Sequence, residues 1–211
     1  MLEVLTNPNN FFEARMKGEE SLRIPVFIVL ISGIIGGISA FLQNSMTVKM
    51  MSDVPPEAQS IVSIMPTASA FVAVVFSFII WVIVATIFFG ISSIFKGEGK
   101  FNRTLEFVGY GYIPKIIGGI ISAVLLYNFI STAQIPAITN PMALMKSPMM
   151  LLLFIIGILF MLWSANIWVF GLKHARNLST KNALITVAIP VALYYIIMIY
   201  FLHWVSQMGV M

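Results

Sequence analysis

Cysteine is absent from this 211-residue chain, and only 9% of its residues are charged. Without cysteine the chain has no disulfide, no thiolate nucleophile and no cysteine ligand for a metal. Soluble domains carry about 25% charged residues. A composition this poor in charge, with 59% hydrophobic residues and a mean hydropathy of +0.97, therefore excludes a water-soluble protein.

Catalytic and metal-binding groups are also scarce. The only histidines are His174 and His203, and they fall on opposite sides of the membrane predicted below. The sequence has no nucleophile elbow and no grouping of serine, histidine and carboxylate. We therefore expect no enzymatic activity, no metal site and no cofactor. Nucleic acid is not expected as a partner, because the basic residues are split among short, separated segments.

Long apolar runs dominate what is present. A membrane-spanning helix needs about 20 mostly apolar residues. Five runs approach or exceed this length, and they cover about residues 24–42, 68–95, 105–130, 149–172 and 183–204. The sequence thus predicts an all-α, polytopic membrane protein, a five-helix transmembrane bundle that forms a single domain over residues 1–211.

The polar segment 1–23 lacks the layout of a cleavable signal peptide. Asn10 is predicted to cap a short helix there, with Glu13 completing a capping box and Gly18 ending the helix. We expect either a small helix lying on the membrane surface or a frayed tail.

Lysine and arginine predict the orientation, because cytoplasmic connections carry an excess of them. The tail and the loops after the second and fourth runs hold most of these residues, whereas the predicted loops 43–67 and 131–148 hold only Lys49 and Lys146. We expect a plasma-membrane protein with its N-terminus cytoplasmic and its C-terminus outside. The basic loops could also hold anionic lipid headgroups, although the positive-inside bias alone accounts for them.

Gly33 and Gly37 lie about one helical turn apart in the first run. Small residues at this spacing let helix backbones approach closely. They predict a packing face and leave a homo-oligomer open.

Lys115 is the first candidate functional residue, because it interrupts the third run. If that helix enters the membrane at Thr104, Lys115 lies about 16 Å along it and needs a partner. Glu106 is about 13 Å away along the helix, too far for a direct pair. Alternatively, Thr104–Tyr112 lies along the interface, the span starts near Ile113, and Lys115 reaches the cytoplasmic headgroups.

The other candidates are Tyr110, Tyr112, Pro114 and Asn166. The two tyrosines suit a position at the membrane interface, and Pro114 interrupts the third run. Asn166, in the inner half of the fourth run, is expected to hydrogen-bond to another helix, with contact to a solute as the alternative.

Short motifs occur in order along most of the chain. They are Asn7-Pro8 with Phe11-Phe12, then Gly97-Glu-Gly-Lys-Phe101 leading into Gly109-Tyr110 and Ile113-Pro114, and finally Trp163 followed by Gly171-Leu-Lys-His and Leu178-Ser-Thr-Lys-Asn-Ala183. With the five spans, these motifs resemble those of the Yip family, the Ypt-interacting-protein domain of membrane proteins.

The resemblance implies a five-helix membrane domain with a cytoplasmic N-terminus. Eukaryotic relatives are linked to Rab-type GTPases and vesicle trafficking, whereas prokaryotic members supply no settled activity. This chain lacks the long N-terminal extension of the eukaryotic trafficking members, which weakens the case for GTPase binding. The short tail and the absence of cysteine indicate a prokaryotic-type member.

Together these observations predict a non-enzymatic membrane protein of the Yip type. It would act through helix packing and a basic cytoplasmic face on membrane lipids or on a cytoplasmic protein partner. A small-solute or ion permease is the alternative, indicated by Lys115, Asn166 and the proline-broken spans.

Overall fold

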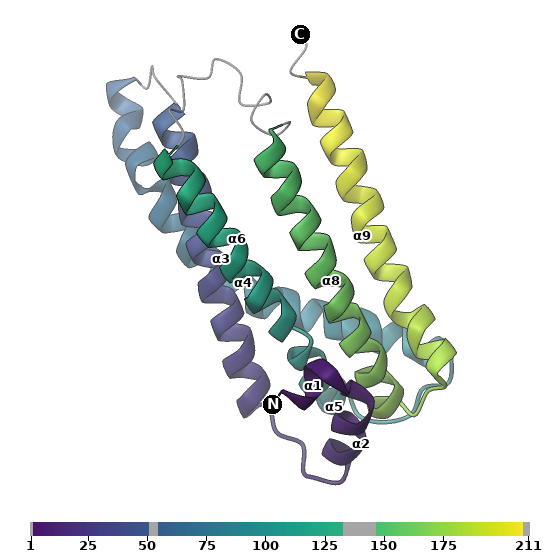
Figure 1. Ribbon diagram of the computed structural model, residues 1–211. Helices are drawn as coiled ribbons and strands as arrows, with labels where there is room; N and C mark the ends of the chain where they lie inside the picture. The colour runs from purple at the N-terminus through teal and green to yellow at the C-terminus, as the bar shows by residue number, and fades with distance from the viewer. Residues whose placement is uncertain (1, 51–54, 133–146, 209–211) are drawn as a thin grey trace.

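The computed structural model describes residues 2–50, 55–132 and 147–208, and no strand occurs among them. The helices, shown in Figure 1, are α1 (Glu3–Thr6), α2 (Pro8–Met16), α3 (Arg23–Met50), α4 (Pro56–Ile94), α5 (Phe101–Tyr110), α6 (Ile113–Thr132), α8 (Pro148–Ala175) and α9 (Thr180–Met208). The prediction of an all-α protein is confirmed.

Within the described ranges, five helical segments are long and apolar enough to cross a membrane. They are α3, α4, the segment Phe101–Thr132 that contains α5 and α6, α8 and α9. This confirms a multi-pass helical membrane protein with five spans.

The first two spans are longer than their apolar runs. α3 continues to Met50, and α4 begins at Pro56 with Pro66 inside it. The predicted loop over 43–67 is therefore wrong for most of its length. The polar residues after residue 42 keep helical geometry, so the end of the apolar run did not mark the end of the helix. Most of the predicted loop 131–148 lies outside the described residues.

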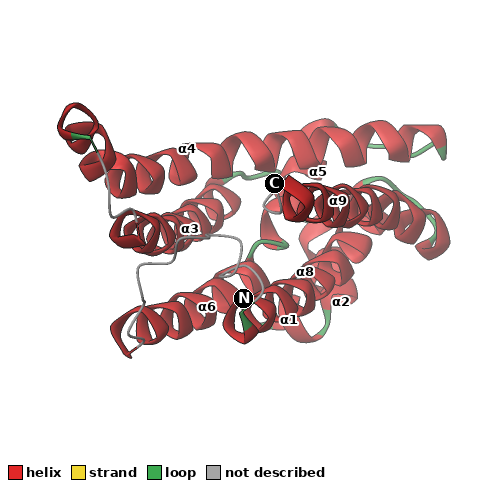
Figure 2. Cartoon of the chain, turned by 90° about the horizontal axis from the view of Figure 1, so that it is seen from above, coloured by secondary structure: helices red, strands yellow, loops and turns green. Residues whose placement is uncertain are grey.

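The long helices form a ring. α3 contacts α4 and α6, α6 contacts α8, α8 contacts α9, and α9 contacts α4. Figure 2 shows this ring from above. α4 has 39 residues and runs diagonally behind the other helices in Figure 1. A strong tilt of this kind is how a helix longer than the bilayer is accommodated.

The two ends of the bundle differ. We call the end where α3 and α9 begin and α4 and α8 finish the basic end, and the opposite one the far end. α1, α2 and α5 all lie at the basic end (Figure 1). The three basic segments of the sequence are therefore gathered at one end of the molecule, as the charge count predicts.

The third predicted run is broken into two helices. α5 ends at Tyr110, and α6 starts at Ile113 after a turn, although the apolar segment long enough to cross a membrane covers Phe101–Thr132. In this turn Gly111 lies so close to the indole of Trp168 that any side chain would overlap it. α5 does not lie on the surface, however, because its residues from Arg103 to Tyr110 are all buried.

The N-terminal helix begins earlier than predicted. Its N-cap is Asn7, whose side chain accepts a hydrogen bond of 3.3 Å from the backbone N–H of Asn10. Pro8 occupies the first helical position, where a missing N–H is tolerated. Asn10 is therefore inside the helix, and the predicted capping box with Glu13 is wrong.

Candidate functional site

Three charged side chains meet where α2 packs over α5. Glu106 is fully buried. One of its oxygens lies 2.7 Å from Arg15 Nη2, and the other lies 2.9 Å from Arg103 Nη1. Arg103 also donates a 2.7 Å hydrogen bond to the carbonyl of Gly18. A buried carboxylate needs partners of this kind to remain ionised. The network fastens the N-terminal segment to α5.

Aromatic contacts extend the same attachment. The ring centroids of Phe12 and Phe107 are 4.6 Å apart, and Phe11 lies edge-on to Tyr110 at 5.1 Å. On α8, Trp163 Nε1 donates a 3.3 Å hydrogen bond to the carbonyl of Leu5. The N-terminal helices are thus docked on α5 and α8, which rules out the frayed tail.

Arg176 joins the loop after α4 to the connection between α8 and α9. It is 3% exposed, and its guanidinium donates hydrogen bonds to Ser92, Ser93, Gly97 and Gly99. The guanidinium also stacks over the ring of Phe89 at 4.0 Å. Burial lowers the pKa of Arg176 from its ordinary value, but a guanidinium still carries its charge at neutral pH.

A second set of basic side chains at this end is exposed and forms no hydrogen bond or ion pair with another described residue. We call this set the basic rim, and it consists of Lys17, Arg23, Lys96, Lys100 and Lys181. The cations of the basic end thus divide in two. Some arginines hold the fold together, while the rim faces outward.

A cavity of about 1000 Å³ lies inside the ring of helices. Its walls come mainly from α4, α6, α8 and α9, and Gln43 of α3 contributes a side chain. Most of the lining is apolar, with isoleucines of α4 facing phenylalanine and methionine side chains of α8. The ionisable or hydroxyl-bearing side chains of the wall are Lys115, Ser122, Tyr194 and Tyr195.

Lys115 lies at the basic end of this cavity, in the first turn of α6. Its Nζ is 4.7 Å from the ring centroid of Tyr112 and 5.1 Å from that of Trp168. The indole of Trp168 is itself fixed by a 2.8 Å hydrogen bond to the carbonyl of Val108. Within the described residues no carboxylate pairs with Lys115, since Glu106 is held by the two arginines. The structure therefore favours a lysine that faces a cavity over one that reaches the headgroups.

The remaining predicted residues are scattered. Tyr112 and Pro114 flank the start of α6, beside Lys115, whereas Tyr110 packs under Phe11 in the N-terminal attachment. Asn166 is exposed on α8, and its side chain forms no hydrogen bond to any residue the structure describes. The predicted interhelical bond of Asn166 is therefore not found.

The two glycines of the first span pack against α4 of the same chain. A Cβ at Gly37 would lie 2.8 Å from the carbonyl oxygen of Ala70, and one at Gly33 would lie 3.2 Å from Val74 Cα. At both glycines, α3 therefore comes close to α4 of the same chain.

Sequence reasoning missed the charge network and the Arg176 contacts. Arg103 and Glu106 are three residues apart on one helix, a spacing that brings side chains together, so this pair carried a usable signal. Arg15 and Arg176 carried none, because their partners are distant in sequence.

Fold and site together define a multi-pass helical membrane protein with a docked N-terminal segment and a central cavity. The profile of the Yip1 domain matches residues 2–202, so the chain belongs to the Yip1 domain family, as its motifs indicate. An uncharacterized protein of Methanocaldococcus jannaschii is 37% identical over 134 residues, which are 64% of this chain and 93% of that relative. No solved structure matches the chain.

Proposed function

We propose that this protein is a non-enzymatic component of the plasma membrane that binds anionic lipid headgroups through its basic rim. In this proposal the basic end and the N-terminus face the cytoplasm, and the whole chain acts as one domain. The observation that carries the proposal is the division of the cations, because the rim residues have no partner in the described protein and all face outward at one end.

The rim is presented on a fixed support. Arg176 holds the turn between Lys96 and Lys100 through hydrogen bonds to the carbonyls of Gly97 and Gly99. Binding of a headgroup to this turn therefore costs little conformational entropy. A lysine or arginine near an anionic membrane surface contributes about 1 kcal/mol to binding. Several such residues at the same end of the bundle favour binding to an anionic leaflet over a neutral one.

Lipid selectivity tests this function. The purified protein is placed in vesicles of phosphatidylglycerol and phosphatidylcholine, and spin-labelled analogues report the relative occupancy of its lipid shell. In K96Q/K100Q, the preference for phosphatidylglycerol should fall about thirtyfold, because two contributions of about 1 kcal/mol are removed. The matched control K49Q/K146Q removes two lysines on the other side of the predicted membrane and should leave the preference unchanged. An equal preference in all three proteins would refute the proposal.

A small-solute permease is the second candidate, and the central cavity favours it. The floor of the cavity at the basic end is closed, since Phe88 and Trp168 are almost fully buried and their rings meet edge to face at 5.4 Å. Transport would require this floor to open. Solute flux into proteoliposomes above that of protein-free vesicles would support a permease, and equal flux from Lys115→Ala would remove this lysine from its mechanism.

A further inference from the structure

We propose that the central cavity is a binding site for one anionic lipid, whose headgroup lies on Lys115 and whose acyl chain runs between α4, α8 and α9. This site is separate from the basic rim, which meets headgroups at the outer surface of the basic end. This proposal goes beyond the rim proposal, and the two proposals are tested with variants at different residues.

The first step is the charge of Lys115. Its ammonium lies over the rings of Tyr112 and Trp168 and forms no hydrogen bond or ion pair with a described residue. Such cation–π contacts stabilise a cation but do not neutralise it, and an ionisable group inside a membrane protein needs a partner. Lys115 also lies in the first turn of α6, where the helix dipole is positive and favours a bound anion.

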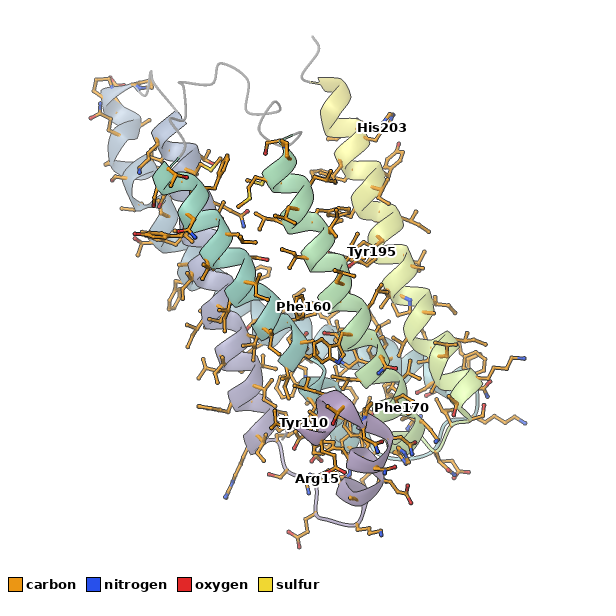
Figure 3. All side chains as sticks on the ribbon, viewed as in Figure 1. Arg15, Tyr110, Phe160, Phe170, Tyr195 and His203 are labelled. Carbon is orange, nitrogen blue, oxygen red and sulfur yellow. The ribbon has the colours of Figure 1, made fainter. Side chains whose placement is uncertain are left out.

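The second step is the shape of the cavity. The lining residues of α8 extend from Met150 to Trp168, about 27 Å at 1.5 Å per residue. Half of a hydrocarbon core is about 15 Å thick, so the cavity is long enough for an acyl chain. Figure 3 labels two wall residues, Phe160 on α8 and Tyr195 on α9, which lie at different heights along the bundle.

The third step is the chemistry of the walls. A site for a polar solute places several polar groups so that they converge. Here Gln43, Ser122 and the tyrosines of α9 lie away from Lys115 along the helices, and the rest of the wall is mostly apolar. Free phosphate would gain nothing from that wall, and a neutral lipid would leave Lys115 unpaired. A lipid with an anionic headgroup pairs with Lys115 through its headgroup and covers the apolar wall with its acyl chain.

Gly157 offers a way to fill the cavity without disturbing the fold. It lies in the wall, and a Cβ built on it meets nothing within 4 Å. Gly90 of α4 has the same open surroundings. Both glycines are exposed, but Gly90 is not part of the wall. G157L and G90L therefore form a matched pair.

The experiment is native mass spectrometry of the full chain, extracted from vesicles with equal amounts of phosphatidylglycerol and phosphatidylcholine. The measured quantities are the amount and the identity of the lipid that stays bound to the protein longest as collision energy rises. We expect wild type and G90L to retain one phosphatidylglycerol, and G157L to retain about tenfold less lipid. K115M should lower the ratio of phosphatidylglycerol to phosphatidylcholine about fivefold, whereas K96Q/K100Q should not change it.

Retention by G157L at the wild-type level, or an unchanged lipid ratio in K115M, overturns the proposal. If G157L melts well below wild type, S122L replaces it, because Ser122 of α6 lies in the same wall. A second arm adds inorganic phosphate without lipid to the K96Q/K100Q protein, whose rim is weakened. Protection of this protein against heat by phosphate, but not by phosphatidylglycerol, would also overturn the proposal. Failure of the rim proposal leaves these outcomes unaffected.

Discussion

Glu106 and Lys115 show two ways in which an apolar protein accommodates a charged side chain. The carboxylate of Glu106 is fully buried yet lies within 2.9 Å of two guanidinium groups. Lys115 lies over two aromatic rings and has no ion-pair partner among the described residues. The first arrangement is complete within the chain and is therefore structural. The second is incomplete, which is why the ligand proposal rests on Lys115.

Replacing Glu106 should therefore act on stability. E106Q keeps the size of the side chain but removes the negative charge between Arg15 and Arg103. Breaking a buried ion pair by removing one partner costs about 3 kcal/mol or more, so we expect a clearly lower melting temperature in detergent. E19Q is the control, since Glu19 is exposed. A melting temperature of E106Q equal to that of E19Q would contradict a structural role for the network.

At the scale of the helices, the contact between α3 and α4 rests on small residues. Gly37 lies against the backbone of α4 at Ala70, whereas a Cβ at the neighbouring Gly36 would meet nothing within 4 Å. Because lipid offers no hydrophobic drive to pack helices, such close backbone contacts carry much of the association.

Leucine substitutions at these adjacent glycines compare the same added side chain at a packed position and at an unpacked one. G37L must push the two helices apart, and overpacking of this kind typically costs about 1–3 kcal/mol. G36L adds the same side chain on the exposed side and should be close to neutral. Thermal unfolding of both variants in one detergent measures the difference. Equal melting temperatures would show that the α3–α4 contact tolerates a wider separation.

Sequence reasoning located the helices through their apolar runs and succeeded where burial in lipid sets the composition. It failed at the ends, because residues such as Gln43 and Asn44 continue a helix that leaves the apolar run. It also treated the N-terminal segment as independent. Docking of that segment depends on Arg15 meeting Glu106, a contact between residues far apart in sequence that no local pattern encodes. Lys115 was singled out because it interrupts an apolar run, but only the ring of helices shows that it faces a cavity.

At the scale of the whole molecule, the two halves of the bundle are built differently. Most of the largest fully buried side chains, including Phe12, Phe88, Phe107, Trp168 and Leu172, belong to segments that meet at the basic end, and Leu126 of α6 is the exception. Towards the far end, the ring encloses the cavity. One half is a packed platform held by arginines, and the other is hollow. This division places the basic rim and the floor of the cavity on the same packed half of the bundle.

The orientation of that platform can be measured directly, because the chain contains no cysteine. Single cysteines replace Lys49 near the far end of α3 and Lys100 in the basic rim, both exposed. With the basic end in the cytoplasm, a membrane-impermeant maleimide should label K49C on intact cells and K100C only after permeabilisation. The two positions lie at opposite ends of the bundle, so each is the other's control. Labelling of K100C on intact cells would place the rim outside and remove the basis for its binding to the inner leaflet.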